Sequence, residues 1–163
     1  MCNIIEIIPT LLGAIVGGIC TFAGSWFLMK KELSYQVYTA RHNLHIALIS
    51  DAGLCERIAE DFEQAGHGSS TLDLAEYIFT SKDLIFTAIK THQWLGNKDF
   101  SDGDKHIILE AYHFLTSVVR LSNKECDYSY LSTSLLEAHR RCREAADLIT
   151  KNLNASQGED QTK

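Results

Sequence analysis

The side chains best suited to bind a metal ion lie within one predicted helix. His106, Glu110 and His113 are separated by four and then three residues, so they would share one helix face. Imidazole nitrogens and a carboxylate oxygen are ligands for zinc or iron. Glu110 and His113 also have the Glu-x-x-His spacing of di-iron bundles, which need a second such motif. No second motif is present, so we expect no bound cofactor; a metal-dependent oxidoreductase is an alternative.

Two histidines could respond to pH. His42 and His45 are three residues apart on a predicted helix, close to an apolar segment that ends at Met29. Protonation there could alter packing or lipid contact, but three-residue spacing is common. We interpret both as surface or boundary residues.

Three arginines of the last predicted helix form a small basic patch. Arg140, Arg141 and Arg143 could meet anionic lipid headgroups or an acidic partner. Glu137 and Glu144 are spaced to pair with Arg141 and Arg140 along the same helix. The preferred interpretation is therefore a solvated, ion-paired face.

No motif of a common enzyme class is present. The chain lacks a phosphate-binding glycine loop, a His-Glu-x-x-His pair and a nucleophile elbow. Its net charge of -6 gives no basic face for nucleic acid. The five cysteines are odd in number and include no Cys-x-x-Cys pair, so we expect reduced thiols. We therefore expect neither an enzyme nor a nucleic-acid-binding protein.

The elements that hold these side chains follow a long apolar segment. Residues 7–29 contain no charged side chain, and every Lys and Arg lies at Lys30 or beyond. A helix of about 23 residues reaches roughly 34 Å, enough to cross a hydrocarbon core of about 30 Å. Trp26 would lie at interfacial depth, and Lys30 and Lys31 would anchor the end. The sequence predicts one transmembrane helix in the lipid bilayer.

The distribution of charge predicts the orientation of this helix. Lys30, Lys31 and Arg41 follow the segment, whereas Glu6 is the one charged side chain before it. By the positive-inside rule, residues 1–6 lie outside the inner (plasma) membrane and the C-terminal domain is cytoplasmic. A cleaved signal peptide is the alternative, but it would need a basic region before the apolar run and a shorter core.

Small residues form a stripe along the predicted span. Gly13, Gly17, Thr21 and Ser25 recur every fourth position, with Gly24 beside them. Because helices associate in lipid through close backbone approach, this stripe predicts self-association into a homo-oligomer. The alternative is that the stripe faces lipid.

Residues 30–154 show helical periodicity without strand alternation. The first pattern runs to Phe62 and stops before the loop sequence at 66–70. Thr71 and Ser81 could each begin a short helix, the second ending at Gly96. Ser101, followed by two aspartates, begins another helix, and the last runs over about 129–153. The chain is therefore predicted to be all-α: a transmembrane helix, a cytoplasmic bundle of about four principal helices, and a flexible tail over 155–163.

This architecture predicts a membrane-anchored interaction protein that self-associates through residues 7–29 and binds a cytoplasmic protein partner. The alternative is a membrane-perturbing effector. In layout the chain resembles small single-span bacterial toxins and antiphage defence effectors. That resemblance implies spans that assemble and compromise the bilayer.

Overall fold

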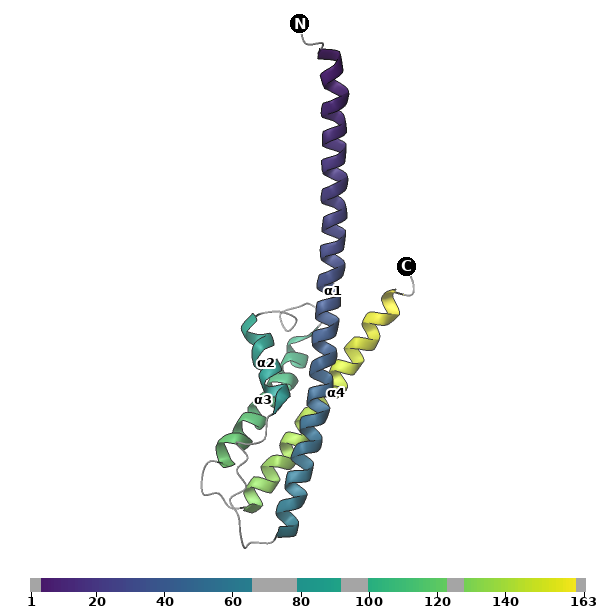
Figure 1. Ribbon diagram of the computed structural model, residues 1–163. Coiled ribbons are helices and arrows are strands. Elements are labelled where there is room, and N and C mark those ends of the chain that lie inside the picture. Colours follow the sequence, from purple (N-terminus) through teal and green to yellow (C-terminus); the bar gives the residue numbers. More distant parts are fainter. Residues whose placement is uncertain (1–3, 66–78, 92–99, 123–127, 161–163) are drawn as a thin grey trace. The chain divides into compact units, whose positions relative to one another are not determined.

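The computed structural model contains four helices and no strand in the residues it describes, which are 4–65, 79–91, 100–122 and 128–160 (Figure 1). The helices are α1 (Ile4–Ala65), α2 (Thr80–Thr91), α3 (Asp102–Ser122) and α4 (Tyr128–Asp160). The all-helical prediction is confirmed for these residues. The chain divides into two units, Met1–Tyr38 and Thr39–Lys163. The first contains the beginning of α1, and the second contains the rest of α1 with α2, α3 and α4.

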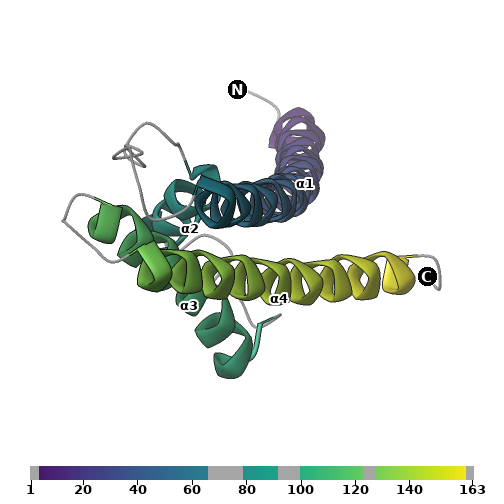
Figure 2. The same ribbon diagram turned by 90° about the horizontal axis from the view of Figure 1, so that it is seen from below.

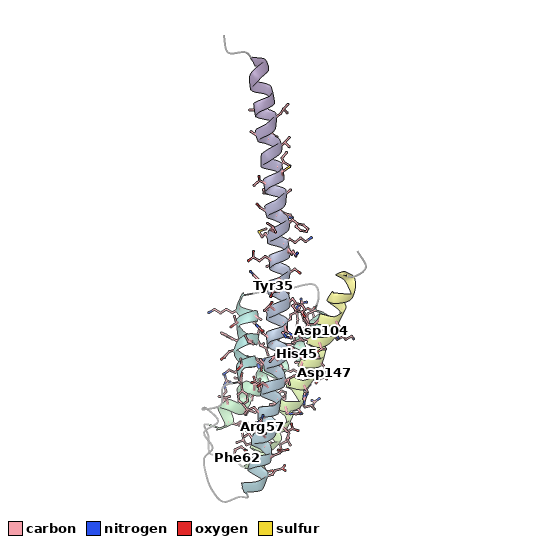
Figure 3. The ribbon with its side chains drawn as sticks, turned by 45° about the vertical axis from the view of Figure 1, so that its right-hand side comes forward. Tyr35, His45, Arg57, Phe62, Asp104 and Asp147 are labelled. Carbon is pink, nitrogen blue, oxygen red and sulfur yellow. The ribbon has the colours of Figure 1, made fainter. Side chains whose placement is uncertain are left out.

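The first unit is a single stretch of helix with an uncovered surface. Every residue from Leu11 to Gln36 is exposed, and side chains project from the helix along its length before Tyr35 (Figure 3). The helix begins at Ile4, three residues earlier than the predicted segment. Pro9 therefore lies beyond the first turn, and the helix continues past the backbone donor that Pro9 lacks.

The second unit is a helical bundle whose core follows the predicted apolar stripes. In α1 the buried positions recur every three or four residues, from Leu44 and Leu48 to Phe62. α3 contributes Ile108, Ala111, Leu115 and Val118, and α4 contributes Leu135, Ala138, Cys142, Ala145 and Ile149. α3 packs against α4 and α2 against α3. Residues 39–65 of α1 lie alongside α4 and run in the opposite direction (Figures 1 and 2).

The start of α3 is held by the predicted cap. The hydroxyl oxygen of Ser101 accepts a hydrogen bond from the Asp104 N–H at 3.1 Å. The Asp104 carboxylate in turn accepts one from the Ser101 N–H at 2.9 Å. This reciprocal pair satisfies two backbone donors that the first turn leaves without intrahelical partners.

Two helix boundaries differ from the predictions, and two predicted boundaries lie outside the described residues. α2 begins at Thr80, so Ser81 is inside its first turn instead of preceding it. α4 continues to Asp160 rather than ending near Leu153, because extending a formed helix costs little and no Pro interrupts residues 154–160. The short helix expected after Thr71 and the stop at Gly96 lie outside the described residues.

Candidate functional site

One described helix, α1, contains a stretch that is long and apolar enough to cross a membrane. None of that apolar stretch is buried inside the protein. The large apolar side chains from Leu11 to Met29 are between 50% and 71% exposed. This distinguishes the segment from the core helix of a soluble domain, whose apolar face would be covered by neighbouring helices.

The predicted self-association residues all lie on this uncovered helix. Gly13, Gly17, Thr21, Gly24 and Ser25 are exposed. A Cβ atom placed on any of the three glycines would meet no atom within 4 Å, so no contact within the chain requires glycine there. Each glycine inside a helix costs about 0.5–1 kcal/mol relative to alanine. The small-residue stripe therefore has no explanation in the packing of one chain.

One hydroxyl of this stretch is satisfied without a partner chain. The Thr21 hydroxyl donates a hydrogen bond to the Gly17 carbonyl oxygen at 2.8 Å within the helix. Such a bond removes the need for water or another side chain around the hydroxyl.

Towards the end of the apolar segment at Met29, the Trp26 ring stacks on Phe22 with 6.4 Å between ring centroids. Lys30 and Lys31, the predicted anchors, follow as exposed residues.

The metal candidate does not assemble as a ligand set. His106 Nδ1 lies 3.5 Å from Glu110 Oε1, but the other oxygen of Glu110 lies 2.6 Å from the guanidinium of Arg141. His113 packs its ring edge-on against Tyr112. In the described part of the chain, no three His, Cys, Asp or Glu side chains are grouped closely enough to hold a metal ion. Because the Arg141 guanidinium occupies one oxygen of Glu110, this geometry supports an ion pair between α3 and α4 better than a metal site.

Two residues of the basic patch, Arg140 and Arg141, form an ion-pair network, as their spacing from Glu137 and Glu144 predicts, and the third, Arg143, is exposed. Arg140 Nη2 lies 2.6 Å from Glu137, and Arg141 Nε lies 3.0 Å from the same carboxylate. Hydrogen bonding from Arg140 lowers the pKa of Glu137 to about 2. Glu144 lies 3.5 Å from both arginines. With Arg141 also bound to Glu110, this network joins α4 to α3.

A buried polar cluster between α1 and α2 was not predicted from the sequence. Asp51 of α1 is 2% exposed, and its Oδ2 accepts hydrogen bonds from the N–H of Ser81 at 2.8 Å and the Ser81 hydroxyl at 2.5 Å. Burial raises the pKa of Asp51, although the hydrogen bonds from Ser81 oppose this shift. The α1 carboxylate therefore caps the first turn of α2 from a distance of 30 residues in sequence.

Burial disfavours the thiolate form of the thiols near this cluster. Cys55 and Cys142 are free and fully buried. Burial raises the pKa of the Cys55 thiol to about 12, and it raises the pKa of Cys142 as well. A buried thiol without a nearby cation forms little thiolate, so neither residue has the character of a nucleophile. Cys20 is also free, and Cys2 and Cys126 lie outside the described residues.

α1 and α4 are joined by a histidine that the sequence did not single out. The Nδ1–H of His139 donates to the backbone carbonyl of Ala52 at 3.0 Å, and Glu56 lies 3.9 Å from the same nitrogen. Of the two histidines expected near the membrane, His45 is partly buried and His42 is exposed.

The comparisons with known proteins assign no family to this arrangement. No protein-family model matches the chain, and neither the curated proteins nor the solved structures include a significant match.

Proposed function

We propose that the chain is a membrane-anchored helical interaction protein. In this proposal residues 7–29 cross the bilayer, the bundle lies on the cytoplasmic side, and copies associate through the small-residue stripe. The observation that carries the proposal is the uncovered apolar surface of α1 between Leu11 and Met29. Soluble monomers rarely leave a contiguous apolar surface of this length in water, whereas lipid covers it at no cost.

The continuity of α1 argues against a cleaved signal sequence. The helix runs without a break from the apolar stretch to Ala65, and its later residues include Leu44 and Leu48 of the core. A signal peptide ends at an accessible cleavage site after a short apolar region, and it is preceded by basic residues. The cytoplasmic placement of the bundle is supported by the position of Lys30 and Lys31 after the span.

A cytoplasmic protein partner is supported by exposed aromatic surface in the bundle. Phe86 of α2 is 51% exposed and stacks on Tyr112 of α3, with 6.4 Å between ring centroids. Aromatic side chains are enriched where proteins bind one another, because they bury a large area for little loss of conformational freedom.

The effector alternative is less well supported by the residues of the span. A path for ions would need polar or ionised groups lining it, and from Leu11 to Met29 the polar side chains are Thr, Ser and Cys. The Thr21 hydroxyl is already bonded within its own helix. An anchor therefore fits this segment better than a conduit. Loss of membrane potential on expression of the chain would favour the effector instead.

The self-association surface is tested by enlarging the glycines. Replacing Gly13 and Gly17 together by Ile should weaken association in a membrane dimerisation assay by about tenfold or more, because the side chains separate the backbones. Ala23→Ile is the matched control, since it adds the same side chain outside the stripe, about 100° around the helix from the midpoint of Gly13 and Gly17. An unchanged signal from Gly13→Ile/Gly17→Ile would remove this interface.

A further inference from the structure

In the second unit, α1 has a face opposite to the one that packs into the bundle. We name it the outer face, and its members recur at steps of three and four residues: Thr39, His42, Ile46, Ile49 and Gly53. His42 and the two isoleucines are exposed, and Thr39 and Gly53 are partly buried. Ile46 is 53% exposed and Ile49 is 39% exposed. The buried residues Leu44, Leu48 and Cys55 project from the other side of the same helix.

The outer face differs from the other exposed helix surfaces by its lack of charge. Between Glu32 and Asp51 the one residue with a permanent charge is Arg41, which is 4% exposed and packs over the ring of Phe100. Helix faces that stay in water are normally rich in charged side chains, as α4 is around Arg140. A neutral face with two exposed isoleucines is typical of a surface that another helix covers.

Gly53 gives independent support for a covering helix. A Cβ atom at this position would meet no atom within 4 Å, so the packing of the chain does not require glycine. Glycine in the middle of a helix costs about 0.5–1 kcal/mol relative to alanine. What the missing side chain does provide is room for a backbone to approach from outside.

We propose that a second copy of this chain covers the outer face, through a parallel, two-fold symmetric contact. Two-fold symmetry near the axis sets each residue against the same residue of its partner. Charged surfaces therefore repel in such a contact, and each copy carries a net charge of -6. The outer face is the part of α1 beyond residue 38 where identical copies meet without that repulsion and bury isoleucine against isoleucine.

This inference rests on the proposed function, because a common membrane anchor holds copies parallel and raises their effective concentration. In the sequence, steps of four, seven and four residues lead back from Thr39 through Tyr35 and Leu28 to Gly24. Steps of this size keep positions near one face of a helix, so the sequence pattern of the outer face is in register with Gly24 of the stripe proposed to meet within lipid. The contact through the outer face would add to the contact between the spans, and substitutions can remove either contact without the other.

The test is a charge exchange at one position of the full-length protein. Ile46→Glu and Ile46→Lys are each reconstituted in phosphatidylcholine vesicles, and association is followed by energy transfer between labelled copies as lipid is diluted. Each variant alone should associate about tenfold more weakly, because like charges meet at the axis. Mixing the two variants should restore association to within about threefold of the original chain, because opposite charges then meet.

The matched control is Leu136, an apolar residue of α4 that is 45% exposed. Leu136→Glu should leave association unchanged. If Ile46→Glu and Ile46→Lys associate normally, or if both are weak and mixing does not restore them, the outer face is not covered by a second copy. Those results would not contradict the membrane anchor. The contact between the spans is tested separately, by Gly13→Ile/Gly17→Ile in a chain that keeps Ile46.

Discussion

At the scale of single residues, Asp51 is a polar group that joins two helices of the bundle. It is buried, and one carboxylate oxygen serves both the N–H and the hydroxyl of Ser81 in another helix. Removing that oxygen leaves two buried donors without their acceptor. The cost of a buried polar group left unsatisfied exceeds the net gain from forming the hydrogen bond.

Asp51→Ala should therefore lower the free energy of unfolding of the bundle by about 2 kcal/mol or more. The measurement is urea denaturation of the full-length protein in mild detergent, followed by circular dichroism. Asp83→Ala is the control, because Asp83 lies in the same turn of α2 as Ser81 but has a side chain that is 71% exposed. The control should change stability by about 0.5 kcal/mol at most. Equal effects of the two substitutions would contradict the capping role.

The pH dependence of stability has a sign that follows from burial. Because burial raises the pKa of Asp51 above 3.8, the folded state holds the proton more tightly than the unfolded chain does. Its contribution to stability is present below the unfolded pKa and is lost as the pH rises through the folded pKa. Asp51→Asn removes this titration while keeping an acceptor. The stability of the original chain relative to Asp51→Asn should fall as the pH is raised from about 3.8. A difference that stays constant with pH would refute this account of Asp51.

At the scale of helices, Arg141 joins α4 to α3. Its guanidinium lies 2.6 Å from Glu110 and over the ring of Phe114, and its side chain is 22% exposed. Arg140 differs: it bonds residues of its own helix and is 55% exposed. Arg141 connects α4 to α3, whereas the ion pairs of Arg140 stay within α4, so replacing the two arginines should have different effects on stability.

Arg141→Ala should destabilise the bundle by about 1–2 kcal/mol, through the lost ion pair and the lost packing of its side chain. Arg140→Ala is the control and should cost about 0.5 kcal/mol at most, because exposed ion pairs contribute little. Urea denaturation of both variants provides the comparison. A larger loss from Arg140→Ala would show that the contacts within α4 outweigh the contact between helices.

The elements could be predicted where the signal is local. The three- and four-residue spacing of apolar residues predicted the buried faces of α1, α3 and α4, and Ser101 with Asp104 predicted the start of α3. The stop of α1 before Gly66 follows from the same kind of signal. Each of these depends on residues within a few positions of one another, which a single sequence displays.

What could not be predicted depends on residues that are distant in sequence. Ser81 looks like a cap for its own helix, but its donors are taken by Asp51 from α1. Glu110 looks like a metal ligand beside His113, but Arg141 from α4 binds it. Neither partner is marked by sequence spacing, because the two positions meet only after the helices pack. The residues of the predicted membrane interface stay a prediction, since they concern contacts outside one chain.

At the scale of the whole molecule, the account depends on where the uncovered part of α1 resides. From Leu11 to Met29 the helix is apolar and exposed, and the residues with permanent charges begin again at Lys30. Both proposed contacts between copies, through the span and through the outer face, assume that lipid covers this surface. Anchoring in the membrane is therefore the central claim, and it can be tested without knowing the partner.

The most direct test is extraction of membrane vesicles that contain the full-length chain with alkaline sodium carbonate, which releases peripheral proteins and leaves integral ones. The account predicts that the intact chain stays in the membrane pellet and enters solution only when detergent is added. Recovery of the intact chain in the carbonate supernatant would contradict the anchor.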